Sequence, residues 1–305
     1  MRIFNTIPTA FPWIISSAAI LALIYPPIFI WFSGTLITLG LGGIMLGMGL
    51  TLRLSDFNEV RKTPSWVLTG FFFQFTVMPL FGWLLGYVFS LPPFFAVGLI
   101  LVSSCPGGTA SNVIVFLSKS NLALSVTMTT ISTIASIVLT PLLISNLSGN
   151  IIDVDAMGLF YSTLKVILIP ILLGIFINTK FPNYTESIKV YSPSFAVILI
   201  TLIVASIIGQ GKQIILSSGL SLLFAIMSLH MIGFVLGYFL SKLLLKNEAV
   251  SKTISIEVGM QNSGLGVVLA KENFVNPAVA IPSAISSLVH SLYGSIFVAL
   301  FRKKN

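Results

Sequence analysis

The sequence predicts an all-α polytopic membrane protein with ten transmembrane helices, arranged as two inverted five-helix repeats. The 305 residues are 56% apolar and 8% charged, whereas a soluble domain carries roughly 25% charged residues. The apolar residues form ten segments close to the ~20 residues that span a bilayer. The fourth and the ninth segments are both interrupted, and they hold corresponding positions in the two halves, which is typical of inverted-repeat transporters.

Short polar connections separate the ten segments. Segment 2 is rich in glycine, which suits close packing between membrane helices. Segment 3 carries the lone amide of Gln74 among phenylalanines, and segment 5 begins at Asn121 and is dense in serine and threonine. Arg2 precedes segment 1 without a small-residue cleavage site, so we interpret this segment as a membrane helix rather than a removed signal peptide. The predicted segments are 11–32, 35–52, 66–89, 93–118, 121–145, 157–178, 191–209, 218–245, 249–271 and 278–301.

The basic residues predict that both termini are cytoplasmic. Of the 16 lysines and arginines, 13 lie on the N-terminal side of the predicted membrane, two (Lys212 and Lys271) lie on the other side, and Lys165 lies within segment 6. Cytoplasmic loops carry such an excess, so the charge balance supports an even number of spans in an inner (plasma) membrane. The same scatter among loops argues against nucleic-acid binding. The 13 are Arg2, Arg53, Arg61, Lys62, Lys119, Lys180, Lys189, Lys242, Lys246, Lys252, Arg302, Lys303 and Lys304.

The two interruptions differ in chemistry. The first, at residues 105–109, reads Cys-Pro-Gly-Gly-Thr. Proline removes a backbone donor there, and the glycines allow the chain to unwind. The half-helix that follows is expected to start near Thr109, with Ser111 and Asn112 in its first turn and free N–H groups that can receive an anion. The second interruption is predicted at Asn262-Ser263-Gly264.

Glu257 is the acidic residue that falls inside an apolar segment, whereas the other seven acids lie in or beside polar connections. A carboxylate near the centre of a bilayer costs on the order of 2.5–3.5 kcal/mol, so it indicates a functional site. Gln261, four residues on, shares its helix face. Carboxylate, amide and freed backbone carbonyls together favour a small hard cation. The alternative is a protonated glutamic acid, hydrogen-bonded where helices pack.

Other polar residues keep two interpretations. Ser125 and Thr129 are four apart on one face and could bind a cation, or could bond to their own helix backbone. Gln74 could be a ligand or make an interhelical hydrogen bond. His290, in the middle of segment 10, could bind substrate, carry a proton or be a satisfied core histidine, which is how we interpret His230.

Several motifs resemble the bile acid:sodium symporter family, and in particular the bacterial homologues of the apical sodium-dependent bile acid transporter. They are C-P-G-G-T-A-S-N at 105–112, N-L-A-L-S-V-T-M-T at 121–129, I-E-V-G-M-Q-N-S-G-L at 256–265 and G-M-G-L-T-L at 47–52, together with the glutamine of segment 3. The resemblance covers essentially the whole chain. It implies crossing broken helices 4 and 9, panel helices in 1–60 and 157–210, and core helices in 65–146 and 218–305.

The resemblance also implies two Na⁺ sites and a substrate site. The first Na⁺ site would use Ser111, Asn112, Ser125, Thr129 and Glu257. The second would use Gln74, Glu257, Gln261 and the backbone carbonyls of Val258 and Met260. Candidates for substrate contact near the crossing are Gly108, Thr109, Asn262 and His290.

From these observations we expect a sodium-coupled secondary active symporter of organic anions, either bile acid-like or small carboxylates, that works as a monomer in a lipid bilayer. Access would alternate as the core moves against the panel. A proton-coupled organic anion carrier is the near alternative. A channel is a further alternative, because broken helices also build selectivity filters. The chain shows no Ser–His, paired-Asp or metal-ligand spacing of an enzyme.

Overall fold

The computed structural model describes residues 7–52, 62–217 and 219–301, and every regular element within them is a helix. The helices before the middle of the chain are α2 (Phe11–Ile24), η1 (Pro26–Ile28), α3 (Thr35–Thr51), α5 (Pro64–Val88), α6 (Pro93–Ser103), α7 (Ser111–Leu117) and α8 (Leu122–Ser148). Those after it are α9 (Ala156–Thr163), η3 (Leu164–Leu168), α10 (Ile169–Lys180), α11 (Pro182–Lys189), α12 (Ser192–Gln210), α13 (Lys212–Ser217), α14 (Gly219–Leu245), α15 (Glu248–Gly259), α16 (Ser263–Asn273), η4 (Pro277–Ala280) and α17 (Ile281–Phe301).

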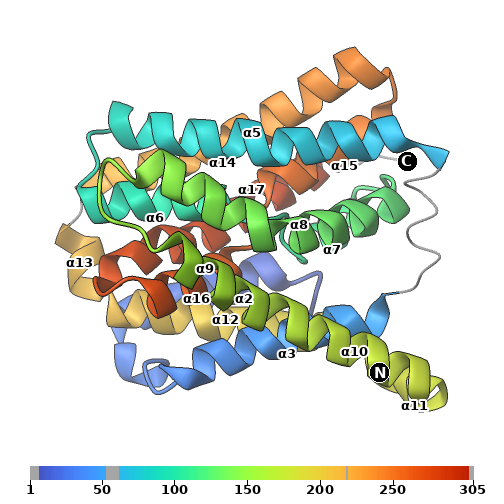
Figure 1. Ribbon diagram of the computed structural model, residues 1–305, viewed down its shortest axis with the longest axis horizontal. Coiled ribbons are helices and arrows are strands. Elements are labelled where there is room, and N and C mark those ends of the chain that lie inside the picture. Colours follow the sequence, from blue (N-terminus) through green and yellow to red (C-terminus); the bar gives the residue numbers. More distant parts are fainter. Residues whose placement is uncertain (1–6, 53–61, 218, 302–305) are drawn as a thin grey trace.

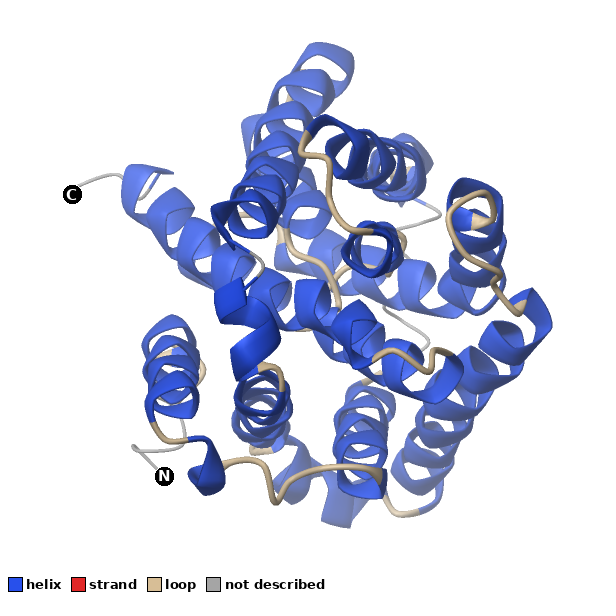
Figure 2. Ribbon diagram, turned by 90° about the vertical axis from the view of Figure 1, so that its left-hand side faces the viewer, coloured by secondary structure: helices blue, strands red, loops and turns tan. Residues whose placement is uncertain are grey.

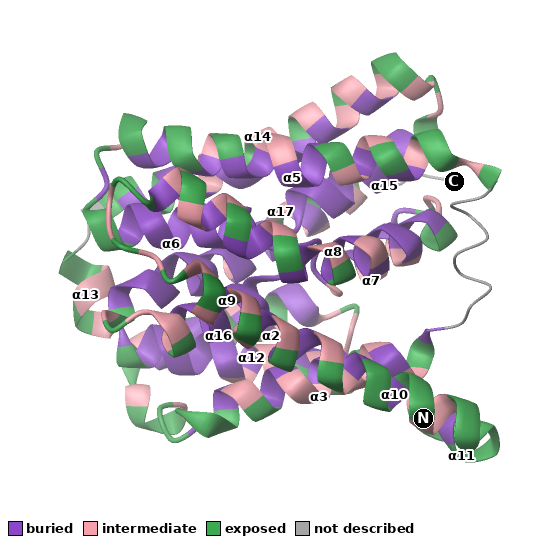
Figure 3. Cartoon of the chain, viewed as in Figure 1, coloured by how far each residue is buried: buried purple, intermediate pink, exposed green. Residues whose placement is uncertain are grey.

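The helices are those of a polytopic membrane protein. Six of them, counting α9 to α10 and η4 to α17 as continuous, are long and apolar enough to cross a bilayer, and α2, α3 and α6 are shorter apolar helices. Large apolar side chains such as Leu172 and Phe176 of α10 are exposed on the outer surface, which suits contact with lipid tails rather than water. Burial concentrates on the inner helices α15, α16 and α17, whereas the outer helices carry the exposed residues (Figure 3).

The helices pack in two groups, with α16 between them. In one group α12 packs on α2 and α3, and α3 packs on α10; in the other α5 packs on α6, α8 and α14, and α14 packs on α15 and α17. Figure 1 shows the first group below and the second above, and Figure 2 shows the same arrangement from the side. Contacts of α16 with α3 and α12 on one side, and with α6 and α17 on the other, join the groups.

Side-chain caps start several of these helices. Asn121 accepts a hydrogen bond from Leu124 N at the start of α8, and Asn247 accepts one from Val250 N at the start of α15. These oxygens satisfy N–H groups that have no partner inside the helix. Such caps matter more in a membrane, where no water replaces them.

Some boundaries differ from the sequence predictions. The first helix ends at Ile24 instead of residue 32, because Pro26 and Pro27 cannot continue it and form η1 instead. Two short helices, α11 and α13, occupy connections that were predicted as loops. The remaining predicted segments coincide with described helices to within a few residues, apart from the interruptions.

Candidate cation and substrate site

The first break separates α6 from α7 and covers residues 104–110. Gly108 N donates a 2.8 Å hydrogen bond to Met260 O of the second break. The backbone of Gly108 is therefore paired with the other broken helix and not with a turn of its own helix. A side chain on Gly108 would place Cβ only 2.7 Å from Gln261 O. This position therefore requires glycine, because the two backbones approach too closely for any larger residue.

The second break covers residues 260–262, between α15 and α16. Asn262 N donates to Pro106 O at 2.8 Å, and Gly107 and Gln261 form an isolated antiparallel bridge. The prediction had placed this break at Asn262-Ser263-Gly264. The helix restarts earlier because the Asn262 side chain accepts from Leu265 N at 3.1 Å, which makes it the N-cap and Ser263 the first helical residue. By contrast, α7 starts later than predicted, at Ser111 rather than near Thr109.

Glu257 lies in the last turn of α15 with only 2% of its surface exposed. Ser111 Oγ donates to its Oε1, as does Ser125 Oγ at 2.5 Å, and Thr129 Oγ1 donates to Oε2 at 2.7 Å. Ser125 Oγ also lies 2.8 Å from Asn112 Oδ1, an alternative acceptor for its single proton. The five residues predicted for the first cation site thus come together from α7, α8 and α15.

No cationic side chain of the described residues forms an ion pair with Glu257. Burying an unpaired carboxylate is costly, and hydroxyl donors offset only part of this cost. The same described residues contain no cluster of three His, Cys, Asp or Glu side chains. The cluster around Glu257 therefore has one charge and several neutral oxygens, which is the donor set of a small hard cation rather than of a transition metal.

A second polar cluster lies beside the breaks. Gln74 Nε2 donates to Gln261 Oε1 at 2.7 Å and to Cys105 O at 2.8 Å. Gln261 Nε2 in turn donates to Val258 O at 2.9 Å. The Met260 carbonyl accepts from Gly108 but keeps a second lone pair. The residues predicted for the second cation site are therefore neighbours, and their amide and carbonyl oxygens are again hard donors.

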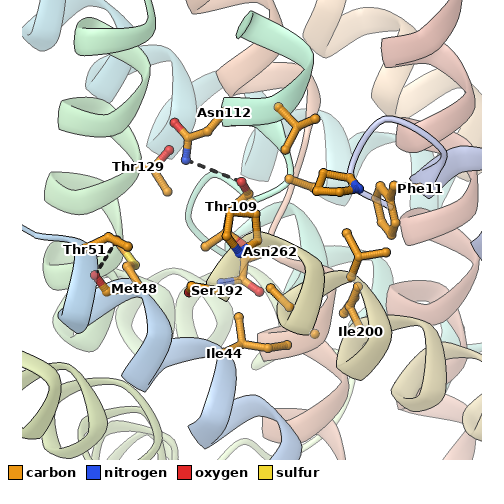
Figure 4. Close-up of a pocket in the computed structure, with 18 of the residues that line it drawn as sticks. Phe11, Ile44, Met48, Thr51, Thr109, Asn112, Thr129, Ser192, Ile200 and Asn262 are labelled. Carbon is orange, nitrogen blue, oxygen red and sulfur yellow. Dashed lines mark hydrogen bonds between the residues drawn. The ribbon is translucent and has the colours of Figure 1, made fainter. Parts of the chain in front are cut away.

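A cavity of about 650 Å³ lies against the crossing of the two breaks. Gly108, Thr109, Asn262 and His290, the four predicted substrate contacts, all line it, as do Asn112, Thr129 and Gln261 of the two polar clusters. Figure 4 shows Asn112, Thr129, Thr109 and Asn262 on one wall and Met48, Ile44, Ser192 and Ile200 across from them. The opposite wall, from α3 and α12, was not identified from the sequence, because its residues are ordinary membrane-helix residues.

The two histidines are buried and adjacent. Their ring centroids are 5.3 Å apart in an edge-to-face arrangement. Both ring nitrogens of His230 have partners, as the core interpretation of this residue predicts. His290 Nε2 contacts Ser263 Oγ at 3.1 Å, whereas its buried Nδ1 has no hydrogen-bond partner among the described residues. An unsatisfied buried nitrogen in a cavity wall keeps His290 a candidate for substrate contact.

The fold and the site define a class of protein: a polytopic helical membrane protein in which two broken helices meet around a buried carboxylate. A family profile described as the Sodium Bile acid symporter family matches residues 38–218. A protein of Oryza sativa subsp. japonica, named "Probable sodium/metabolite cotransporter BASS1, chloroplastic", is 44% identical over 302 residues, which are 99% of this chain and 74% of that protein.

A second relative is bacterial. The Bacillus subtilis (strain 168) protein named "Uncharacterized sodium-dependent transporter YocS" is 44% identical over 293 residues, which are 96% of this chain and 90% of that protein. The chain belongs to the sodium bile acid symporter family. It is a membrane transporter of a sodium-dependent family and not an enzyme.

Proposed function

We propose that the chain is a Na⁺-coupled symporter of organic anions. The observation that carries the proposal is the Glu257 carboxylate, which is buried at the crossing of two broken helices and bonded only to hydroxyl donors among the described residues. A cation would supply the missing countercharge. The relatives named as sodium-dependent or sodium/metabolite transporters support Na⁺ as this cation.

Two Na⁺ ions would share Glu257. One would bind among Ser111, Asn112, Ser125 and Thr129, and the three hydroxyls would turn so that their oxygen lone pairs face the ion. The other would bind among Gln74, Gln261 and the Val258 and Met260 carbonyls. Two monovalent cations beside one carboxylate leave a single net positive charge in a medium of low dielectric constant. That charge attracts an anionic substrate, and by linkage the bound anion raises the affinity for Na⁺ by the same factor.

The cavity suits an organic anion of moderate size. Of the described residues that line it, none is Lys, Arg, Asp or Glu, so the attraction must come from the bound cations and from backbone and amide donors. Asn262 Nδ2 is buried, has no hydrogen-bond partner in the described part of the chain, and lies at the N-terminus of α16, where N–H groups favour an anion. Apolar side chains such as Ile44, Met48 and Ile200 complete the wall and would contact the carbon skeleton.

We infer that the cavity is entered from the end of the molecule where α2 and α12 begin and α3 ends. Phe11 at the start of α2, Thr51 at the end of α3 and Ser192 at the start of α12 all line it. With the termini in the cytoplasm, as the positive charges indicate, this is an inward-facing arrangement in the plasma membrane. Lys212, one of the two basic residues predicted on the outer side of the membrane, belongs to α13. Figure 1 places α13 and α11 at opposite ends of the molecule.

At that opposite end, three consecutive residues of α16 form hydrogen bonds to α12, α3 and α9. Lys271 Nζ donates to Gln210 Oε1 of α12 at 3.2 Å, Thr38 Oγ1 of α3 donates to Glu272 Oε1 at 2.8 Å, and Ser162 Oγ of α9 donates to Asn273 Oδ1 at 3.1 Å. Outward opening would require the core helices (residues 65–146 and 218–305) to separate from the panel helices (1–60 and 157–210) at these contacts. Ten spans in two inverted repeats would supply the two related halves for such a motion.

The test is uptake of carboxylates and steroid acids into proteoliposomes that contain the purified protein. A Na⁺ gradient should drive accumulation, and replacing Na⁺ with K⁺ or choline should abolish it. Accumulation that follows a pH gradient without Na⁺ would instead establish the proton-coupled carrier. Ion currents far above carrier turnover would establish a channel.

A further inference from the structure

We propose that His230 is a positioning residue that fixes the geometry of the second break, and thereby sets the affinity for Na⁺. This inference rests on the proposed sodium coupling. His230 is on α14, has no exposed surface and does not line the cavity, so it can act only through its neighbours. Its neighbours are the two ends of the broken helix α15–α16.

The first link is to the end of α15. His230 Nδ1 lies 2.8 Å from the carbonyl oxygen of Gly259, the last residue of that helix. A carbonyl can only accept, so Nδ1 carries the proton in this contact. Gly259 stands between Val258 and Met260, whose carbonyls are the proposed backbone ligands. Holding the Gly259 peptide therefore limits how both ligand carbonyls can turn.

The second link runs to the start of α16. With Nδ1 protonated in the neutral ring, His230 Nε2 accepts from Ser286 Oγ of α17 at 2.7 Å. Ser286 Oγ lies 3.0 Å from Ser263 Oγ, the first residue of α16, and Ser263 Oγ lies 3.1 Å from His290 Nε2. With this direction fixed, Ser263 donates to Ser286, and His290 Nε2 donates to Ser263. One hydrogen-bonded chain thus connects both sides of the break to the cavity wall.

The packing of α14 makes these links specific to the break. Gly233 and Gly237 bring α14 so close to α15 that an added Cβ would lie 3.1 Å from Gly259 Cα and 3.0 Å from Ser255 Cα, respectively. Ser255 Oγ donates to Phe234 O at 2.6 Å. α14 is also linked to the start of α15, where Tyr238 and Lys242 bond Glu248. The Ser255 and Glu248 links lie within the continuous part of α15, whereas among the described residues the His230 link reaches its open end.

Loss of the imidazole would leave the Gly259 carbonyl and the Ser286 hydroxyl without their partner in a dry interior. The helices would remain packed through the glycine contacts, but the carbonyls around Gly259 would lose their fixed orientation. Ions would then have to order their own ligands on binding. A weaker ion affinity with an intact maximal rate is the expected signature, because preorganisation is lost without removing a ligand.

The experiment measures the half-saturating Na⁺ concentration and the maximal rate of uptake for the full chain in proteoliposomes. His230→Phe keeps the ring volume without hydrogen bonds and should raise the half-saturating Na⁺ concentration about tenfold, the effect of about one hydrogen bond, with a similar maximal rate. His230→Asn, which can restore the donor to Gly259, should recover most of the Na⁺ affinity. Ser255→Ala, the matched control on the same helix pair, should leave it unchanged.

Three outcomes would overturn the assignment: an unchanged Na⁺ requirement in His230→Phe, a fall in maximal rate alone, or equal effects of His230→Phe and Ser255→Ala. Should His230→Phe not be recovered folded, Ser286→Ala cuts the same chain at smaller volume cost, and it must also raise the Na⁺ requirement for the inference to hold. A wild-type protein without any Na⁺ dependence would instead contradict the proposed function, so the two failures are distinguishable.

Discussion

Thr129 donates a 2.7 Å hydrogen bond to the Glu257 carboxylate, joining α8 to the last turn of the broken helix α15 across 128 residues of sequence. The same hydroxyl also lies 3.0 Å from Ser125 O of its own helix. Its single proton can serve only one of the two contacts at a time, so the bond to its own backbone competes with the bond to the buried acid, and cation binding by Thr129 stays a prediction.

Two substitutions of Thr129 distinguish the role of its hydroxyl oxygen from the role of its side-chain volume. Thr129→Val keeps the shape but removes one proposed Na⁺ ligand, and it should raise the half-saturating Na⁺ concentration for uptake about tenfold, as loss of about one polar contact implies. Thr129→Ser retains the hydroxyl and should stay close to the wild type. Equal behaviour of the two variants in a Na⁺ titration would exclude Thr129 as a ligand.

Neutralising Glu257 should have a larger effect. Glu257→Gln keeps the side-chain shape but removes the only charge of the cluster, so Na⁺-driven uptake should fall about a hundredfold or more, in line with the loss of one member of a buried charge pair. The control is Glu186→Gln, which removes an exposed acid paired with Lys189 on α11 and should leave uptake unchanged. Robust Na⁺-driven uptake by Glu257→Gln would refute the shared role of this carboxylate.

The crossing of the breaks should not tolerate a methyl group. In Gly108→Ala the new Cβ would meet Gln261 O at 2.7 Å, and relief of this overlap should cost about 1–3 kcal/mol and impair uptake. Gly42→Ala is the matched control, because its nearest neighbour would be Pro170 Cγ at an ordinary 3.9 Å. Thermal unfolding in detergent and uptake are the measurements, and a fully stable, active Gly108→Ala would show that the close approach is dispensable.

A covalent crosslink between core and panel, at the end of the molecule opposite the cavity entrance, should stop transport. Thr38 and Glu272, hydrogen-bonded at 2.8 Å, belong to the proposed panel and core. A Thr38→Cys/Glu272→Cys double variant, bridged by a short thiol-specific crosslinker, should lose uptake while its cavity stays accessible from the cytoplasmic side. Thr38→Cys alone and Glu272→Cys alone, treated in the same way, should remain active, because the native Cys105 is buried. Continued uptake by the crosslinked protein would contradict the core-against-panel motion.

The sequence predicted the site best where a residue type is unusual for a membrane helix. Glu257 stands out because charge is rare in an apolar segment, and the first break is evident because Pro106 and two glycines cannot continue a helix. The second break was misplaced by two residues, because Ser263 and Gly264, which begin α16, were taken as part of the interruption. The role of Asn262 as an N-cap of α16 depends on a hydrogen bond to Leu265 N, and an Asn-Ser-Gly sequence fits either interpretation.

Other parts of the site could not be predicted because they depend on how helices are rotated against one another. The contacts that join His230 and His290 through Ser286 and Ser263 involve three helices, and no sequence spacing relates α14 to α17. The three residues from Lys271 to Asn273 looked like an ordinary polar connection. Their partners on α3, α9 and α12 are visible only in the folded chain. The expectation that the protein is a monomer stays a prediction.

The most direct measurement is equilibrium binding of radioactive Na⁺ to the purified protein, with Glu257→Gln measured in parallel. The account predicts two ions per chain, no displacement by equimolar K⁺, and loss of both ions in the variant, since one carboxylate serves both sites. Absence of Na⁺ binding, or an unchanged number of bound ions in Glu257→Gln, would contradict it.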